Sequence, residues 1–184
     1  MRLVLGKAGQ TVTVGGEGGF TLVEVLVALV VAGVVLSASY GWVWGLGALA
    51  RAHDDRAQAG TIAAAAARSI ADEVCAAVAV APPSATDPSR ALTLVHDHIG
   101  AAREEVKIAW DPGRKVVWRN APGTYIADHV TTFVVAYALR GGREADASSM
   151  SAADWPLVSA VLVKLTTETG SARASRTVLA EVGA

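Results

Sequence analysis

Cysteine and charge are the two things this sequence has least of. Cys75 is the single cysteine among 184 residues, which excludes an intrachain disulfide framework and a zinc site built from cysteines. Charged residues make up only 18% of the chain and nearly cancel, so the formal net charge is −1. This balance argues against a module that holds nucleic acid through a broad positive field, and we expect no nucleic-acid partner.

Apolar residues are correspondingly abundant, at 52% of the chain with a mean hydropathy of +0.39, and they concentrate near the N-terminus. The segment Phe20–Ala50 contains one charged residue, Glu24. A helix of roughly 20 apolar residues crosses a bilayer core of about 30 Å, so residues 20–50 predict a transmembrane helix in a lipid bilayer. Aromatic residues that suit a membrane–water interface follow at the expected depth: Tyr40, Trp42 and Trp44.

The start of this run carries a specific motif, Gly19-Phe20-Thr21-Leu22-Val23-Glu24, followed by an uninterrupted apolar helix. It resembles the processing site of type IV pilins and of type II secretion pseudopilins. The resemblance implies that a membrane prepilin peptidase cuts after Gly19 and methylates the new amine of Phe20. Residues 1–19 are then a leader peptide.

Glu24 is a lone carboxylate inside the predicted span, where an ionised group needs a partner. The resemblance implies that this partner is the N-terminal amine of a neighbouring subunit, which gives Glu24 a role in assembly. The alternative is a glutamate that reaches the lipid headgroups with no protein partner.

Small residues recur every four positions along the same span, at Gly33, Ser37, Gly41 and Gly45. Such stripes let helix backbones approach closely in membranes, so we expect these residues to lie at a helix-packing surface. A second interpretation, compatible with the first, is that the glycines loosen the helix.

Residues 51–80 predict an amphipathic continuation of the same helix. Apolar residues at a spacing of three to four positions define its buried face: Ile62, Ala66, Ile70, Val74 and Ala77. Cys75 lies towards the edge of that face and is expected to be a small packing residue. Prolines at 82, 83 and 88 end the helix.

Residues 81–184 predict a β-rich head. Five or six antiparallel strands are expected, and the ranges are 92–96, 106–110, 115–119, 129–139, 157–167 and 177–182, with a polar loop over 141–155. The fold class is therefore α+β, with a long N-terminal transmembrane helix that continues into a head with an antiparallel sheet, as in pilins. The head loosely resembles the J-type pseudopilin of type II secretion and the W-type minor pilin, through Trp118-Arg119, the segment Ile126–Phe133 with Tyr137, and the strand Ser159–Leu165.

Candidate ligands in the head are few. His96 and His98 share a strand face and could bind a metal, although surface histidines are the favoured interpretation. Glu144, Asp146 and Asp154 could hold calcium, but their spacing lacks an EF-hand pattern. Trp110 and Trp118 flank a turn and could pair across a hairpin. With no catalytic arrangement of side chains, we expect neither enzymatic activity nor a cofactor.

The sequence thus predicts a minor pilin or pseudopilin of a type II secretion or type IV pilus-like filament. Its partners would be prepilin peptidase, other pilin or pseudopilin subunits, an inner-membrane assembly platform and the bilayer. It would lie in the bacterial inner membrane, with a cytoplasmic N-terminus and an extracytoplasmic head. Two alternatives remain: a membrane-anchored binding domain unrelated to pili, and an exported protein cut by an ordinary signal peptidase near Ser37-Ala38-Ser39.

Overall fold

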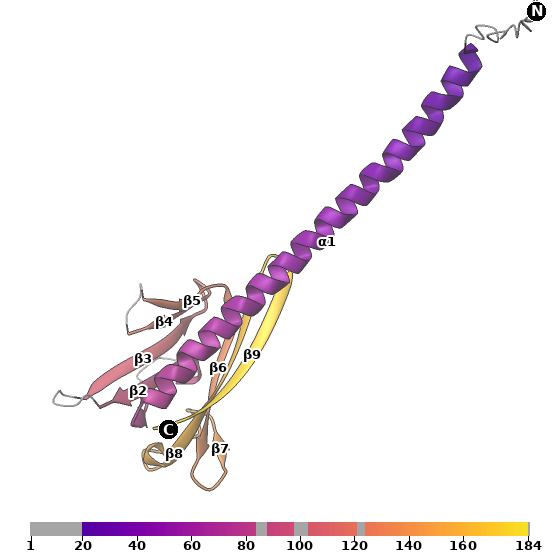
Figure 1. The fold of residues 1–184 in the computed structure, drawn as a ribbon. Helices are drawn as coiled ribbons and strands as arrows, with labels where there is room; N and C mark the ends of the chain where they lie inside the picture. The colour runs from indigo at the N-terminus through magenta and orange to yellow at the C-terminus, as the bar shows by residue number, and fades with distance from the viewer. Residues whose placement is uncertain (1–19, 84–87, 98–102, 121–123, 184) are drawn as a thin grey trace, which may run out of the picture. The chain divides into compact units, whose positions relative to one another are not determined.

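A computed structural model describes residues 20–83, 88–97, 103–120 and 124–183. They fall into two compact units, which divide between Leu46 and Gly47. Helix α1, Leu22–Ala76, contributes residues to both units (Figure 1). The α+β prediction of one long N-terminal helix followed by antiparallel sheet is confirmed.

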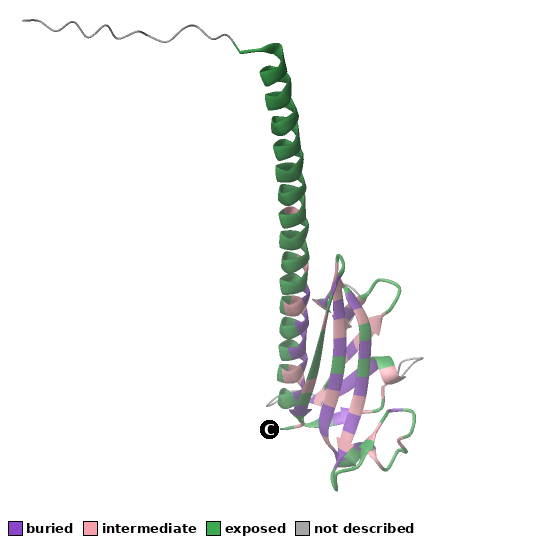
Figure 2. Cartoon of the chain, turned by 90° about the vertical axis from the view of Figure 1, so that its right-hand side faces the viewer, coloured by how far each residue is buried: buried purple, intermediate pink, exposed green. Residues whose placement is uncertain are grey.

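In the first unit, every described residue from Phe20 to Leu46 is exposed (Figure 2). These residues are nevertheless strongly apolar, and α1 is the helix in the described part of the chain that is long and apolar enough to cross a membrane. A helix that is apolar on all sides is typical of a segment surrounded by lipid or by other helices.

The second unit holds two antiparallel sheets. The first sheet runs in the order β1-β2-β3-β4-β5, with the strands Ala79–Ala81, Ala91–His96, Glu104–Asp111, Val116–Arg119 and Tyr125–Ala127. The second runs β7-β6-β8-β9, with β6 at Val130–Leu139, β7 at Glu144–Ala145, β8 at Val158–Thr169 and β9 at Ala172–Glu181. Short 3-10 turns occupy Pro88–Arg90 and Trp155–Leu157.

One hydrophobic core joins the helix to both sheets. It contains one stripe of α1 together with apolar residues from the two sheets, among them Leu92 and Ile108 of the first sheet and Phe133 and Val163 of the second. The predicted helix face is close to the observed one: Ala66, Ile70 and Val74 are buried, as is Ala77 just after the helix, while Ile62 is only half-buried. The other buried residues of the helix are Ala59, Ala63 and Ala67. The many alanines on this stripe allow the helix to lie close to the strands.

Polar contacts supplement this core. The hydroxyl of Thr167, in β8, donates to the carbonyl of Ala59 in α1 at 2.7 Å, and both residues are completely buried. The ring of Tyr137 packs edge-on against Trp155, with centroids 5.2 Å apart, and its hydroxyl donates to the carbonyl of Ala91 at 3.4 Å. Burial raises the pKa of the Tyr137 phenol, so it stays neutral and serves as a donor.

The structure corrects several predicted boundaries. The helix ends at Ala76 rather than Val80, because Ala79–Ala81 pairs with β2 as strand β1. An Ala-Val-Ala segment has little preference of its own, so the free edge of β2 decides its conformation. The predicted loop over 141–155 contains β7, and β9 begins at Ala172, five residues earlier than expected.

The single predicted sheet is in fact two. The chain passes from β5 to β6 through Asp128 and His129, and His129 has a positive φ of 56°. A left-handed residue at this point turns the chain sharply, and β6 then pairs with β8 instead of continuing the first sheet. Alternating patterns predict strands but do not say where one sheet stops, so this division was not visible in the sequence.

Candidate functional site at the start of helix α1

The first turn of α1 is closed by a reciprocal pair of hydrogen bonds. The backbone N–H of Thr21 donates to Oε2 of Glu24 at 3.0 Å, and the N–H of Glu24 donates to Oγ1 of Thr21 at 3.3 Å. The Thr21 hydroxyl also donates to Oε2 at 3.0 Å. This is a capping box, which satisfies amide groups that otherwise have no partner at a helix start.

Because of the capping box, the Glu24 carboxylate has hydrogen-bond partners within its own chain. Its charge lies next to the positive end of the helix dipole and accepts two hydrogen bonds from within its own chain. Both bonds go to Oε2, and the described part of the chain offers no hydrogen-bond donor to Oε1. One oxygen of the carboxylate is therefore available for a group from outside the chain.

Thr21 has a role as helix cap that the predicted site residues do not include. Its signal was present, because a threonine followed three residues later by a glutamate, just before an apolar run, is the pattern of a capping box. Gly19, the predicted cleavage position, lies outside the described residues. Phe20, the predicted methylation position, is 86% exposed at the very start of the described chain.

An apolar groove runs along the helix beside this carboxylate. It is lined by Phe20, Glu24, Val25, Ala28, Leu29 and Ala32. The combination of one carboxylate with apolar walls suits a partner that brings a positive group on an apolar segment.

The predicted small-residue stripe is open to its surroundings. A methyl group placed on Gly33, Gly41 or Gly45 would meet no atom within 4 Å beyond the helix's own backbone. The Ser37 hydroxyl donates to the carbonyl of Gly33 at 2.8 Å, so this polar group is satisfied within the helix. The stripe thus presents a flat surface without unsatisfied hydrogen-bonding groups.

The candidate metal ligands of the head are engaged elsewhere or lie outside the described residues. His96 is buried rather than on the surface, and its Nε2 lies 3.6 Å from Oε2 of Glu73; His98 is outside the described ranges. Glu73 also forms an ion pair with Arg119, whose Nε lies 2.8 Å from Oε1. The Nε–H is not aligned for a hydrogen bond, so the contact is mainly ionic, while Nη2 donates to Oε2 at 3.4 Å.

The acidic residues of the 141–155 segment hold the backbone instead of converging on one point. Asp146 accepts hydrogen bonds from Ser148 and Ser149, and these bonds lower its pKa. Asp154 accepts from Ser151 and pairs with Arg143 at 2.6 Å, and these contacts lower its pKa as well. No group of three or more metal-binding side chains occurs in the described part of the chain.

The remaining candidates of the head also have structural explanations. Trp110 lies opposite Val117 and Trp118 opposite Ala109, so the two tryptophans occupy opposite faces of the hairpin and do not pair. The Trp110 indole N–H donates to the carbonyl of Val130 at 3.0 Å, and the Arg90 guanidinium lies 5.4 Å from its ring centroid. Cys75 is exposed, which overturns its predicted packing role.

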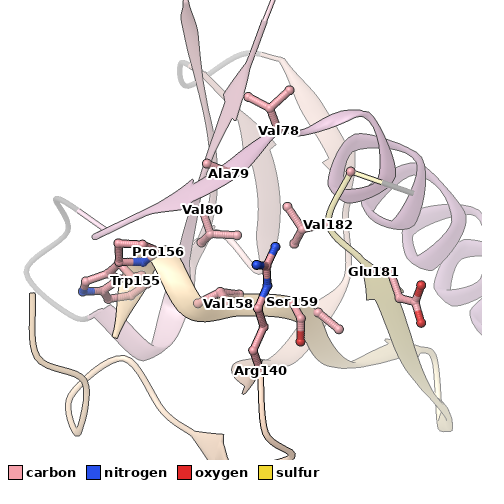
Figure 3. A pocket seen from close by; sticks show the side chains of 12 residues that line it. Val78, Ala79, Val80, Arg140, Trp155, Pro156, Val158, Ser159, Glu181 and Val182 are labelled. Carbon is pink, nitrogen blue, oxygen red and sulfur yellow. The ribbon is translucent and has the colours of Figure 1, made fainter. Parts of the chain in front are cut away.

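The head has a hollow of about 410 Å³ beside strand β1. Valines 78, 80, 158 and 182 are among the residues that line it, and the Arg140 side chain extends into it (Figure 3). A single guanidinium can attract an anion. The other polar side chains that line the hollow are Glu181 and Ser159, and the Ser159 hydroxyl already donates to the carbonyl of Ala138 at 3.2 Å. The motif at the start of α1 therefore remains the strongest indication of function.

Comparison with known proteins points to the same segment. No curated protein and no solved structure matches the chain. The model of the family described as the prokaryotic N-terminal methylation motif matches residues 16–40, which include the predicted cleavage position, Glu24 and the first part of the small-residue stripe. This motif implies processing by a prepilin peptidase and assembly with other pilins, and with the long apolar helix it fits a single-pass anchor in the inner membrane. The match supports a type IV pilin-like protein.

Proposed function

We propose that this chain is a minor pilin or pseudopilin, a non-enzymatic structural subunit of a type II secretion or type IV pilus-like filament. It would be cut after Gly19, methylated on Phe20 and drawn into the filament through its apolar helix. The N-terminus would be cytoplasmic before cleavage, and the β-rich head would lie outside the cytoplasm. The observation that carries the proposal is the methylation motif over residues 16–40.

The geometry of the capping box gives Glu24 a defined role in this proposal. Oε2 holds the first turn of its own helix, and Oε1 remains available. After cleavage the new amine of Phe20 would be the positive group nearest to the same motif in a neighbouring subunit. An ion pair of this kind in lipid forms only between subunits that pack side by side, so it would help to set their register.

The small residues at Gly33, Ser37, Gly41 and Gly45 would allow neighbouring helices to pack closely in the same assembly. An assembly ATPase separate from this chain would supply the energy, since this subunit is proposed to have no enzymatic function of its own.

The first experiment determines the N-terminus. Intact mass and N-terminal sequencing of the full chain, extracted from membranes that contain prepilin peptidase, should show N-methylated Phe20. An uncut N-terminus would favour the unrelated membrane-anchored domain. A new N-terminus near Tyr40 would favour an exported protein.

The second experiment separates the two roles of Glu24. Glu24→Gln keeps an acceptor for the capping box, since glutamine also serves at this position, but removes the charge. We expect this variant to remain in the membrane and to lose co-purification with other pilin subunits. The matched control, Thr21→Ala, weakens the cap by about 0.5–2 kcal/mol but keeps the carboxylate, and it should still co-purify. Normal co-purification of the Glu24→Gln variant with other pilin subunits would refute the proposed ion pair.

A further inference from the structure

A groove in the second unit is lined by three arginines, none of which forms an ion pair with another residue that the structure describes. Residues 56–68 of α1 and Arg176 of β9 line it together. Its floor consists of small residues: Ala57, Gly60, Thr61, Ala64 and Ala65. Arg56, Arg68 and Arg176 are all exposed, and within the described part of the chain none of them lies within 4.0 Å of a carboxylate oxygen.

The unpaired state of these arginines is not due to a shortage of acids nearby. Asp54 and Asp72 lie on the same helix and are exposed, yet neither forms an ion pair with the three arginines. Asp55 is half-buried beside Gly170, where a methyl group on the glycine would collide with its carboxylate. The lining of the groove itself thus carries three positive charges and no negative one, which favours a negatively charged partner.

The shape of the groove limits what that partner can be. Arg56 and Arg68 are 12 residues apart, which is about 18 Å along the helix axis. The headgroup layer of one leaflet is only about 5–8 Å thick, so lipid headgroups would reach both arginines only if the helix lay flat on the membrane. A second helix alongside α1 can follow the whole length of the groove.

The floor of the groove supports the same conclusion. A methyl group on Gly60 would meet nothing within 4 Å, and the neighbouring floor residues have short side chains. A floor of this kind permits close approach of another backbone, while arginines at its borders can form bidentate bonds with carboxylates.

We propose that this groove, formed by Arg56, Arg68, Arg176 and the small residues between them, is the docking surface for an acidic α-helix of a neighbouring pilin-type subunit. The inference rests on the proposed function and adds to it. The contact would lie in the head, outside the apolar segment that carries the methylation motif, and would select neighbours by charge.

The test is site-specific cross-linking of the full chain in membranes that contain prepilin peptidase and the companion pilin subunits. A photo-reactive residue replaces Ala64, which is exposed on the floor of the groove. We expect a cross-link that mass spectrometry maps to an acidic helical segment of a pilin-type subunit. Combining it with Arg56→Glu and Arg68→Glu should lower the yield at least about tenfold, because like charges would then face each other.

Two matched variants complete the design. Arg140→Glu makes one such charge reversal on a different surface of the head, as the control for each single reversal in the groove, and should leave the yield unchanged. Arg68→Lys keeps the positive charge and should retain most of the cross-linking yield. Thermal unfolding of each variant confirms that the head is folded, which is expected because all the substituted side chains are exposed.

The outcomes distinguish this inference from the proposed function. Adducts with lipid alone, or a yield that the charge reversals do not change, overturn the docking groove even when Phe20 is processed and other pilins co-purify. An uncut N-terminus without any co-purifying pilin would overturn the proposed function itself.

Discussion

The two parts of helix α1 differ in whether their own chain buries their apolar side chains. Up to Leu46 the helix is rich in Leu and Val, and every described residue is exposed. Beyond Gly47 it is rich in alanine and less apolar, yet six of its residues are buried against strands. In this helix, the number of apolar side chains does not predict which part is buried within the chain. Burial depends on how the apolar residues are arranged around the helix and on whether a matching surface of the same chain is present.

The physical reason lies in the environment each part is suited to. An apolar surface on every side of a helix cannot be covered by one head, so the first part needs lipid or other helices. A single stripe of small residues matches the inner faces of two sheets, so the second part folds onto its own chain.

The largest expected effect tests this contrast directly. Ile70→Ala should destabilise the head by about 2–5 kcal/mol, because Ile70 is completely buried and its removal leaves a cavity. Urea unfolding of the full chain in detergent, followed by tryptophan fluorescence, measures it. Leu29→Ala is the control, since Leu29 is 67% exposed in the first unit and should leave the unfolding midpoint of the head unchanged. Equal effects of the two substitutions would contradict the contrast.

A smaller loss of folding stability is expected from a substitution where the helix contacts the first sheet. Glu73→Ala removes the carboxylate that faces Arg119 and His96, and it leaves a partly buried guanidinium without its partner. The expected loss is about 1–3 kcal/mol in the same unfolding experiment. Asp54→Ala changes an exposed carboxylate on the same helix, which has no ion-pair partner among the described residues, and should have little effect. A Glu73 variant as stable as the unmodified chain would show that packing alone holds the helix to this sheet.

The smallest effect concerns the exposed segment between β6 and β8. Hydrogen bonds from serines lower the pKa of Asp146 and Asp154, so these bonds favour the folded segment at neutral pH. The contribution disappears as the pH falls below the ordinary value of 3.8 through the lowered pKa values. Hydrogen exchange of residues 146–154 should therefore accelerate in acid before that of β8, after correction for the intrinsic pH dependence. In the Asp146→Asn variant, the backbone amides of this segment should exchange faster already at neutral pH. An unchanged exchange rate in that variant would contradict the assignment.

Much of the fold could be predicted because its signals are local. The apolar run from Phe20 predicts the helix, the spacing of Ala66, Ile70 and Val74 predicts its buried stripe, and alternation predicts β6 and β8. The misses arise where a partner strand decides the conformation. Ala79–Ala81 is a strand because β2 pairs with it, and His96 is buried because the helix covers β2.

The candidate site follows the same division. The motif from Gly19 to Glu24 could be found in the sequence because its residues are consecutive and depend on no tertiary contact. The bonding of Glu24 could have been predicted from Thr21 but was not. The arginine groove could not have been predicted, since Arg176 is 108 residues away from Arg68 in the sequence and only the packing of β9 against α1 brings them together.

The sequence by itself determined the apolar helix, its capping box, the methylation motif and the identity of most strands, because each depends on neighbours within a few residues. Only the tertiary structure decided that the strands form two sheets, that Glu73 faces Arg119 and His96, and that three arginines surround one groove. These features depend on contacts between distant segments, and their free energy arises only when the core that joins α1 to both sheets has formed.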